Sequence, residues 1–361
     1  MKVYLLTAFF VLIFAYLAKN QDMYSEKLTT SGKIVHTSGA KFFLFLICAL
    51  LICVAGLRYY VGTDFGGYYK HYQQYADNVV VSLRTFDEPG YGIISVVSKW
   101  LGATDGGLAV FLASAITIGI VLVTIFRNTD EVEYAVLLYL FMGGWIASFN
   151  AVRQSLAAAF VFAGYRWLRE KKLLRFAVCV LIAFLCHKSA LLMIAMYFIL
   201  HRKINILNIL ITAVGAYVAL QSYDALFSLA GDVLDKNYSF SNTYLTNSVN
   251  ILRIMVGVAP ALYFVISTWK KEKTDIEEFH LNVLILHATL NIVTMNSTYL
   301  ARMALYTAPF VVLSISELSK TINAKYKKVI MIVIILLYFL FWMYELSVSS
   351  ALNHFRFIWQ K

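Results

Sequence analysis

The chain has 361 residues, of which 60% are hydrophobic and only 14% charged, and its mean hydropathy is +0.71. Soluble domains are nearer half apolar and a quarter charged, so the composition excludes an ordinary soluble enzyme and predicts a polytopic α-helical membrane protein. The net charge of +11 does not indicate a nucleic-acid partner, because most Lys and Arg lie in short segments between apolar runs, where they set topology. The cysteines have neither disulfide nor zinc spacing, and nothing requires a metal or another cofactor.

Apolar runs predict an all-α fold of about twelve transmembrane helices in a single integral membrane domain over residues 1–361. In chain order the runs cover residues 3–18, 41–57, 107–126, 134–149, 151–168, 173–186, 188–200, 204–222, 249–268, 279–296, 302–319 and 329–347. Two of them, 173–186 and 188–200, are shorter than the roughly 20 residues of a straight span, so a re-entrant hairpin is the alternative there. Residues 90–104 are more typical of an interfacial helix.

Lysine and arginine gather in alternate loops, which predicts that these loops are cytoplasmic. The two longest polar loops, 58–106 and 223–248, then lie on the extracytoplasmic face of the membrane. The boundary residues Arg58, Arg153 and Arg302 fall on this same face, against the positive-inside trend. An arginine in such a place needs a partner, and we expect that partner to be an anion.

The loop 58–106 opens with a polar run pressed against the end of a span. It holds Arg58, the tyrosines Tyr59 and Tyr60, and the carboxylate of Asp64; Glu88 follows later in the loop. Tyrosines offer flat apolar faces and a hydroxyl, which suits sugar rings, and either carboxylate could accept a proton or a hydrogen bond from a sugar hydroxyl. The alternative is an interfacial aromatic belt with solvated charges.

A second cluster begins the run after residue 149. Helical spacing of Asn150, Arg153 and Gln154 predicts that they share one helix face. The small residues 155–159 follow and permit close helix packing, so we expect Arg153 to point into the bundle. Because an arginine opposes the helix macrodipole at an N-terminus, an anionic ligand is favoured over a purely structural role.

Two further clusters lie at predicted outer span ends. His187 and Lys188 stand between the two short runs, where His187 could shuttle protons near neutral pH, although a lone histidine is commonly a hydrogen-bonded structural residue. Tyr299 and Arg302 border a later run. Guanidinium groups match phosphate oxygens, so the outer arginines are predicted to bind a lipid diphosphate.

The order of these motifs resembles the EpsG family of bacterial polysaccharide polymerases, often grouped with Wzy-type polymerases. The resemblance rests on "GLRYYVGTDFGGYY", "EPGYGIIS", "FNAVRQSLA" and "FLCHKSALL", and extends from residue 1 to about 310. It implies a multi-pass glycosyltransferase of the bacterial cytoplasmic (inner) membrane with its active site on the extracytoplasmic face. Such an enzyme moves a growing chain from its polyprenyl diphosphate carrier to the non-reducing end of the next lipid-linked repeat unit. The family often has an aromatic residue and then Asn after the "GTD" triplet, whereas this chain has Phe65-Gly66-Gly67, which puts the middle of the loop in doubt.

With that resemblance, each candidate residue receives a predicted role. The group that relieves the acceptor hydroxyl of its proton is Asp64, His187 or Glu88. The diphosphate is bound by Arg153, Arg58 and Arg302. Substrate contacts are made by Tyr59, Tyr60, Asn150, Gln154, Lys188 and Tyr299.

The predicted partners are polyprenyl diphosphate-linked donor and acceptor oligosaccharides and membrane lipids, together with a chain-length regulator and a flippase, and no nucleic acid. Two alternatives remain open. One is a flippase or transporter of the same lipid-linked sugars, which requires polar residues through the middle of the spans. The other is an O-acyltransferase or ligase acting on the same glycans, for which His280 or His287 would be the base.

Overall fold

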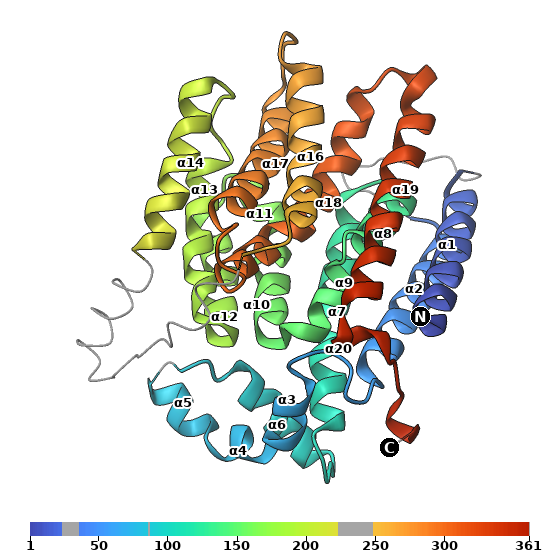
Figure 1. The fold of residues 1–361 in the computed structure, drawn as a ribbon, viewed down its shortest axis with the longest axis vertical. Coiled ribbons are helices and arrows are strands. Elements are labelled where there is room, and N and C mark those ends of the chain that lie inside the picture. The colour runs from blue at the N-terminus through green and yellow to red at the C-terminus, as the bar shows by residue number, and fades with distance from the viewer. Residues whose placement is uncertain (24–35, 86, 223–247, 361) are drawn as a thin grey trace.

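The computed structural model describes residues 1–23, 36–85, 87–222 and 248–360. Over these residues the chain is all helical, as predicted, and its long helices run side by side as a bundle (Figure 1). Four short helices lie across one end of the bundle and together are called the layer here: α3 (Phe65–Lys70), α4 (Tyr72–Asp77), α5 (Val79–Thr85) and α6 (Gly90–Trp100). The predicted loop 58–106 is therefore largely helical.

Helical segments coincide with all of the predicted runs, but not all are long enough to span. Within the described residues, six candidate spans are given by α1 (Lys2–Met23), α2 (Ser38–Gly56), α7 (Gly107–Asn128), α8 with α9 (Val132–Phe141, Gly144–Asn150), α16 (Ile251–Thr268) and α19 (Ala324–Val348). Shorter apolar helices are α10 (Val152–Ala163), α12 (Leu173–Cys186), the 3-10 helix η1 with α13 (Lys188–Ile194, Ala195–Ile199) and α14 (Ile206–Gln221). The predicted number of about twelve spans is not confirmed.

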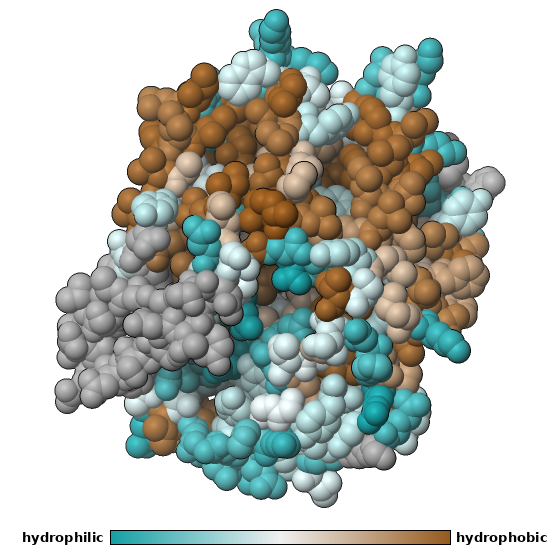
Figure 2. Space-filling model, viewed as in Figure 1, coloured by the Kyte–Doolittle hydropathy of each residue, from teal (hydrophilic) through white to brown (hydrophobic). Residues whose placement is uncertain are grey.

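The core of the bundle is built around α17 (Asp275–Val293), which begins at a capping box formed by Thr274 and Glu277. Every residue of α17 from Phe279 to Leu290 is buried, because α16, α14 and α18 (Ala304–Leu318) pack around it. The outside of the bundle is apolar instead, and Figure 2 shows a wide hydrophobic band above a hydrophilic zone over the layer. This distribution suits helices surrounded by lipid and supports a multi-pass membrane protein.

Polar contacts join α16 to α19 across this apolar surface. Pro260 has no N–H, so it leaves the carbonyl of Val256 without its helical donor, and the Tyr338 hydroxyl of α19 donates to that carbonyl at 3.4 Å. Nearer the layer, Arg253 forms an ion pair with Glu345, with Nε 2.9 Å from Oε1. The proline therefore costs a helical hydrogen bond that a neighbouring helix partly restores.

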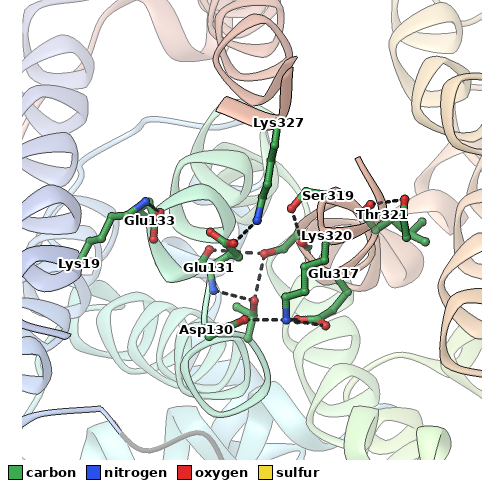
Figure 3. A network of polar contacts seen from close by, with 12 residues as sticks. Lys19, Asp130, Glu131, Glu133, Glu317, Ser319, Lys320, Thr321 and Lys327 are labelled. Carbon is green, nitrogen blue, oxygen red and sulfur yellow. Dashed lines mark hydrogen bonds and ion pairs between the residues drawn. The ribbon is translucent and has the colours of Figure 1, made fainter. Parts of the chain in front are cut away.

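At the end of the bundle away from the layer, ion pairs tie four elements together (Figure 3). The pairs are Lys19 with Glu133, Lys327 with Glu131, and Lys320 with both Asp130 and Glu317. They join α1 to α8, and they join α19 and the 3-10 helix η4 (Ser319–Thr321), which directly follows α18, to the turn between α7 and α8. Basic side chains that were expected to mark this face are thus neutralised in part by carboxylates.

The predictions for two segments outside the long helices have different outcomes. The predicted interfacial helix 90–104 is present as α6, within the layer. The predicted loop 223–248 lies outside the described residues, except for residue 248.

Candidate active site

Arg58, predicted to bind diphosphate, points into the protein. Its side chain is 0% exposed, its Nε donates to the carbonyl of Val61 at 3.1 Å, and its Nη1 donates to the Ala55 carbonyl and to the Ser114 hydroxyl. The guanidinium carbon lies 4.6 Å from the centre of the Phe149 ring. Arg58 therefore ties the end of α2 to α7 and α9, and the prediction that it contacts a ligand is corrected.

The backbone after Arg58 explains why the run folds this way. Gly62 has a φ of +94°, and a Cβ there would come within 2.2 Å of the carbonyl oxygen of Phe149. Only glycine permits this conformation and approach without strain. The run 58–64 is therefore first a packing junction between the end of α2 and α9.

Glu88 is the centre of the polar cluster under the layer. Its Oε2 lies 2.7 Å from Nη1 of Arg153, and its Oε1 accepts a hydrogen bond of 2.9 Å from the backbone N–H of Lys188. Nδ1 of His187 is 2.8 Å from the same Oε1, at an angle outside that of a hydrogen bond. Residues from three distant parts of the sequence thus meet on one carboxylate.

Local geometry brings Glu88 to this position. Gly90 lies so close to the end of α12 that an added Cβ would sit 2.7 Å from Sγ of Cys186. Glu88 itself has a φ of +53°, a left-handed conformation that costs a non-glycine residue free energy and persists where surrounding contacts fix it. The short segment before α6 is therefore pressed against the α12–η1 turn.

The electrostatics of Glu88 indicate a group that is ionised at neutral pH. Its side chain is only 11% exposed, and burial by itself raises the pKa of the carboxyl. The contacts with His187 and Arg153 and the N–H of Lys188 outweigh burial and lower the pKa to about 2. A carboxylate with that pKa is a poor proton acceptor, so the structure favours Glu88 as the group that positions Arg153 and His187.

Arg153 lies between the layer and the bundle and is 32% exposed. Its Nε donates to the hydroxyl of Tyr68 at 3.0 Å while Nη1 holds Glu88. The Arg153 side chain was predicted to point into the bundle, but it points toward the layer, where it meets Tyr68 and Glu88. Among the described residues, its remaining nitrogen has no hydrogen-bond partner, so that nitrogen is open to an anion.

Asp64 is the second carboxylate of the site and differs from Glu88 in its surroundings. Burial raises the pKa of the Asp64 carboxyl above its usual range. This shift is opposed by Arg302, by a hydrogen bond of 3.2 Å from the Thr63 hydroxyl, and by Arg153 and Arg58. All three predicted arginines are therefore close enough to act on one carboxylate. A partly buried carboxyl with a raised pKa is suited to accept and release a proton.

Arg302 is the most accessible arginine of the three. Its side chain is exposed on the 3-10 helix η3 (Leu300–Met303), and among the described residues its guanidinium has no hydrogen bond or ion pair. Its backbone carbonyl accepts a hydrogen bond of 3.1 Å from the side chain of Gln154. Gln154, predicted to contact substrate, is buried and positions Arg302.

The predicted common face of Asn150, Arg153 and Gln154 is wrong. α9 ends at Asn150, and Ala151, whose backbone is not helical (φ −137°, ψ 62°), separates it from α10. Instead, the Asn150 side chain accepts a hydrogen bond of 3.0 Å from the backbone N–H of Thr63. The three side chains therefore reach three different segments, because the helix breaks between them.

The remaining predicted residues surround this cluster. Lys188 is mostly buried, and its Nζ lies 2.7 Å from Oδ1 of Asp87. Tyr59 and Tyr60 contact each other edge to face at 4.9 Å, and Tyr60 is the more exposed of the two. Tyr299 is half-buried beside η3. The structure brings these residues to the same end of the bundle without showing what they bind.

Sequence reasoning did not give Tyr68 a specific role. Tyr68 follows Asp64 by one helical turn, and its N–H donates to the Asp64 carbonyl at 3.3 Å. The i,i+4 spacing of Asp64 and Tyr68 was the feature of the sequence that could have placed Tyr68 beside the candidate site. A second missed contact joins the hydroxyls of Ser189 and Tyr306 at 2.9 Å and holds η1 against α18.

The two histidines of α17, His280 and His287, are hydrogen-bonded to hydroxyl groups of neighbouring helices. Nδ1 of His280 is 3.0 Å from the Ser314 hydroxyl, and its Nε2 is 3.4 Å from the hydroxyl of Tyr165. Nδ1 of His287 is 2.7 Å from the Thr307 hydroxyl. Over the described ranges, no group of three or more His, Cys, Asp and Glu side chains is arranged to hold a metal ion.

Comparison with known families decides what kind of protein carries this site. The model of the EpsG family matches residues 41–358. The chain is a member of the EpsG family. No curated protein and no solved structure matches it. The match contains the layer and every predicted site residue, and EpsG membership assigns the chain a general role in polysaccharide polymerisation within a membrane.

Proposed function

We propose that this EpsG protein polymerises oligosaccharide repeat units carried on polyprenyl diphosphate, with the layer on the extracytoplasmic side of the cytoplasmic membrane. The observation that carries the proposal is Asp64, a partly buried carboxyl of raised pKa, beside two arginines that still have free hydrogen-bonding capacity. Basic side chains gathered at the opposite end of the bundle support this orientation.

In the proposed reaction, a hydroxyl at the non-reducing end of the acceptor attacks the anomeric carbon of the donor. A glycosidic C–O bond forms, the bond from the anomeric carbon to the diphosphate oxygen breaks, and polyprenyl diphosphate leaves with the bonding electrons. The hydroxyl proton passes to the Asp64 carboxylate. Arg302 and the open nitrogen of Arg153 neutralise the charge that develops on the diphosphate.

Glu88 and His187 take a supporting role in this proposal. The ionised Glu88 fixes the guanidinium of Arg153, so that its open nitrogen faces one direction. His187 lies on the same carboxylate and is placed to contact a glycan hydroxyl rather than to remove the reacting proton. Tyr59 and Tyr60 offer ring faces to sugar residues, and chain-length regulators and flippases would supply and limit the lipid-linked substrates.

Two observations weigh against the alternatives. A transporter needs polar groups along the middle of its spans, whereas Arg58 is the only fully buried Asp, Glu, Lys or Arg among the described residues and lies beside the layer. An acyltransferase needs a free base in the bundle, but hydroxyl groups occupy both nitrogens of His280, which leaves Nε2 of His287 as the remaining candidate of the two.

The test uses purified protein in nanodiscs with lipid-linked repeat units, analysed for a polymer ladder. Arg302→Ala should slow elongation about 10- to 100-fold, the worth of a charge-assisted hydrogen bond. Its melting temperature should stay unchanged, because the side chain is exposed. Arg302→Lys should recover part of the activity, and Arg84→Ala, on the exposed surface of α5, is the matched control.

Asp64→Asn and His187→Gln separate the two candidate proton acceptors. Asp64→Asn should abolish the ladder, whereas His187→Gln should retain a reduced ladder with an unchanged pH profile. A ladder of wild-type rate and length from Arg302→Ala or Asp64→Asn would refute the proposed site.

A further inference from the structure

The last described residues, 354–360, return to the layer and pair with the start of the 58–106 segment. Backbone hydrogen bonds of 2.8 Å join Tyr59 to Arg356 and Ile358 to Leu57. They form an antiparallel bridge beside the candidate site. In Figure 1 the C-terminus lies below the bundle, beyond α20 (Ser350–Asn353) and at the level of the layer.

Alternate side chains of this tail form an aromatic ladder that runs from the core to the surface. Phe355 lies edge-on to Tyr4 at 5.4 Å, Phe357 follows at 4.9 Å, and Trp359 stacks on Phe357 at 4.4 Å with an angle of 6°. Tyr4 is 0% exposed, whereas Trp359 is 65% exposed. The side chain of Gln360 fixes the last turn by accepting a hydrogen bond of 2.8 Å from the Phe357 N–H.

The ladder gives the exposed indole a fixed position. An isolated exposed tryptophan needs no explanation, but this ring is backed by another ring and connected to a buried one. A binding surface that is already ordered loses less conformational entropy when a ligand binds. The indole face is electron-rich and attracts partial positive charge, such as the C–H groups on the face of a pyranose ring.

The position of the tail favours a glycan over the membrane surface as the partner. Tryptophan is also common where proteins meet lipid headgroups. The tail, however, lies with the layer below the wide hydrophobic band in Figure 2. It is bonded to the residues that lead directly into Asp64, so a sugar chain reaching the candidate site passes near it.

We propose that Trp359, supported by Phe357 and Phe355, is a sugar-binding platform that holds a pyranose ring of the glycan beside the candidate active site. The inference rests on the proposed function, because it assumes that the glycan lies at the layer end. It adds a specificity-determining residue in the C-terminal tail, which contains none of the motifs described in the sequence analysis.

The test measures binding of oligosaccharides, prepared by partial hydrolysis of the surface polysaccharide of the source organism, to the full chain in nanodiscs. Calorimetric titration gives the affinity of every variant, and the difference in emission between the wild type and Trp359→Phe isolates the signal of Trp359. We expect Trp359→Ala to weaken binding about three- to tenfold, the worth of one aromatic contact. Trp359→Phe should keep part of the affinity. Trp100→Ala, which removes an 81% exposed tryptophan of the layer, is the matched control and should bind like the wild type.

A second nanodisc preparation with brominated acyl chains tests the membrane alternative. Strong quenching of Trp359 by these lipids, without any response to oligosaccharide, would overturn the platform and identify a lipid anchor. Unchanged affinity in Trp359→Ala, or no binding by the wild type, would also overturn it. If Arg302→Ala still loses the polymer ladder in those cases, the platform has failed and the proposed function has not.

Discussion

The carboxylate of Glu88 offers a direct test of how the site is held together. Glu88→Gln keeps the size of the side chain and removes the charge that holds Arg153 and His187. The amide can still accept one hydrogen bond, but it cannot serve as a counterion. We expect the variant to be less stable than the wild type at neutral pH and to lose polymerase activity because Arg153 is no longer fixed.

The size of the effect follows from the pKa. The contacts lower the pKa of Glu88 from an ordinary value of 4.5 to about 2 in the folded protein. A difference of that size corresponds to about 3 kcal/mol in the free energy of unfolding. Because the folded pKa is the lower one, this contribution is fully present above pH 4.5 and is lost as the pH falls toward 2. The group is mostly buried, so solvent screening reduces it little.

Thermal unfolding in nanodiscs between pH 7 and pH 3 measures this contribution. The wild type should lose stability on acidification, and its advantage over Glu88→Gln should shrink as the pH falls below 4.5. Asp77→Asn is the matched control: its carboxylate is 65% exposed, its partner Lys99 is 53% exposed, and an exposed ion pair contributes only about 0–1 kcal/mol.

Equal stability of the wild type and Glu88→Gln at pH 7 would refute the reasoning. An advantage that stays constant from pH 7 to pH 3 would refute it as well, because it would mean that the charge of Glu88 is not what stabilises the cluster.

Two further predictions concern packing away from the charges. Gly62→Ala should lower the melting temperature markedly and reduce protein levels in the membrane, since the new Cβ would meet the Phe149 carbonyl; normal levels would contradict the close approach. Tyr338→Phe should cost about 1 kcal/mol of stability in the wild type and less in a Pro260→Ala background, where the helix regains its own donor. Equal costs in both backgrounds would show that the tyrosine does not act through the unbonded carbonyl.

Much of the architecture was predictable from composition and pattern. Apolar runs form helices because a backbone in lipid must satisfy its hydrogen bonds internally. A helix does so with residues a few positions apart, so the helices can be predicted from local sequence. The order of four motifs was enough to predict the family, and the family match confirms it. The number of spans was not predictable, because several runs are short or broken, as at Gly143, which has a φ of +84°.

The roles of individual site residues depended on the tertiary structure. Sequence alone placed Arg58, Arg153 and Arg302 together, and the structure brings all three near Asp64. It could not distinguish them, because an arginine at a span end is satisfied equally well by a ligand or by carbonyl groups and aromatic rings of its own protein. Arg58 is satisfied by its own protein: it is fully buried, bonds the Val61 carbonyl and lies over the Phe149 ring.

Contacts between segments that are distant in the chain could not be predicted, because the periodicity of a sequence reports only on local structure. Glu88 meets Arg153 and His187 only because Gly90 lets the layer approach the end of α12. The C-terminal tail likewise lies at the layer end of the bundle through its pairing with residues 57–59. Composition determined that this chain is a helical membrane protein, because the backbone of every residue in lipid needs a hydrogen-bond partner from its own helix. Packing across the bundle decided which charges are buried and which stay accessible, because their partners lie far apart in the chain.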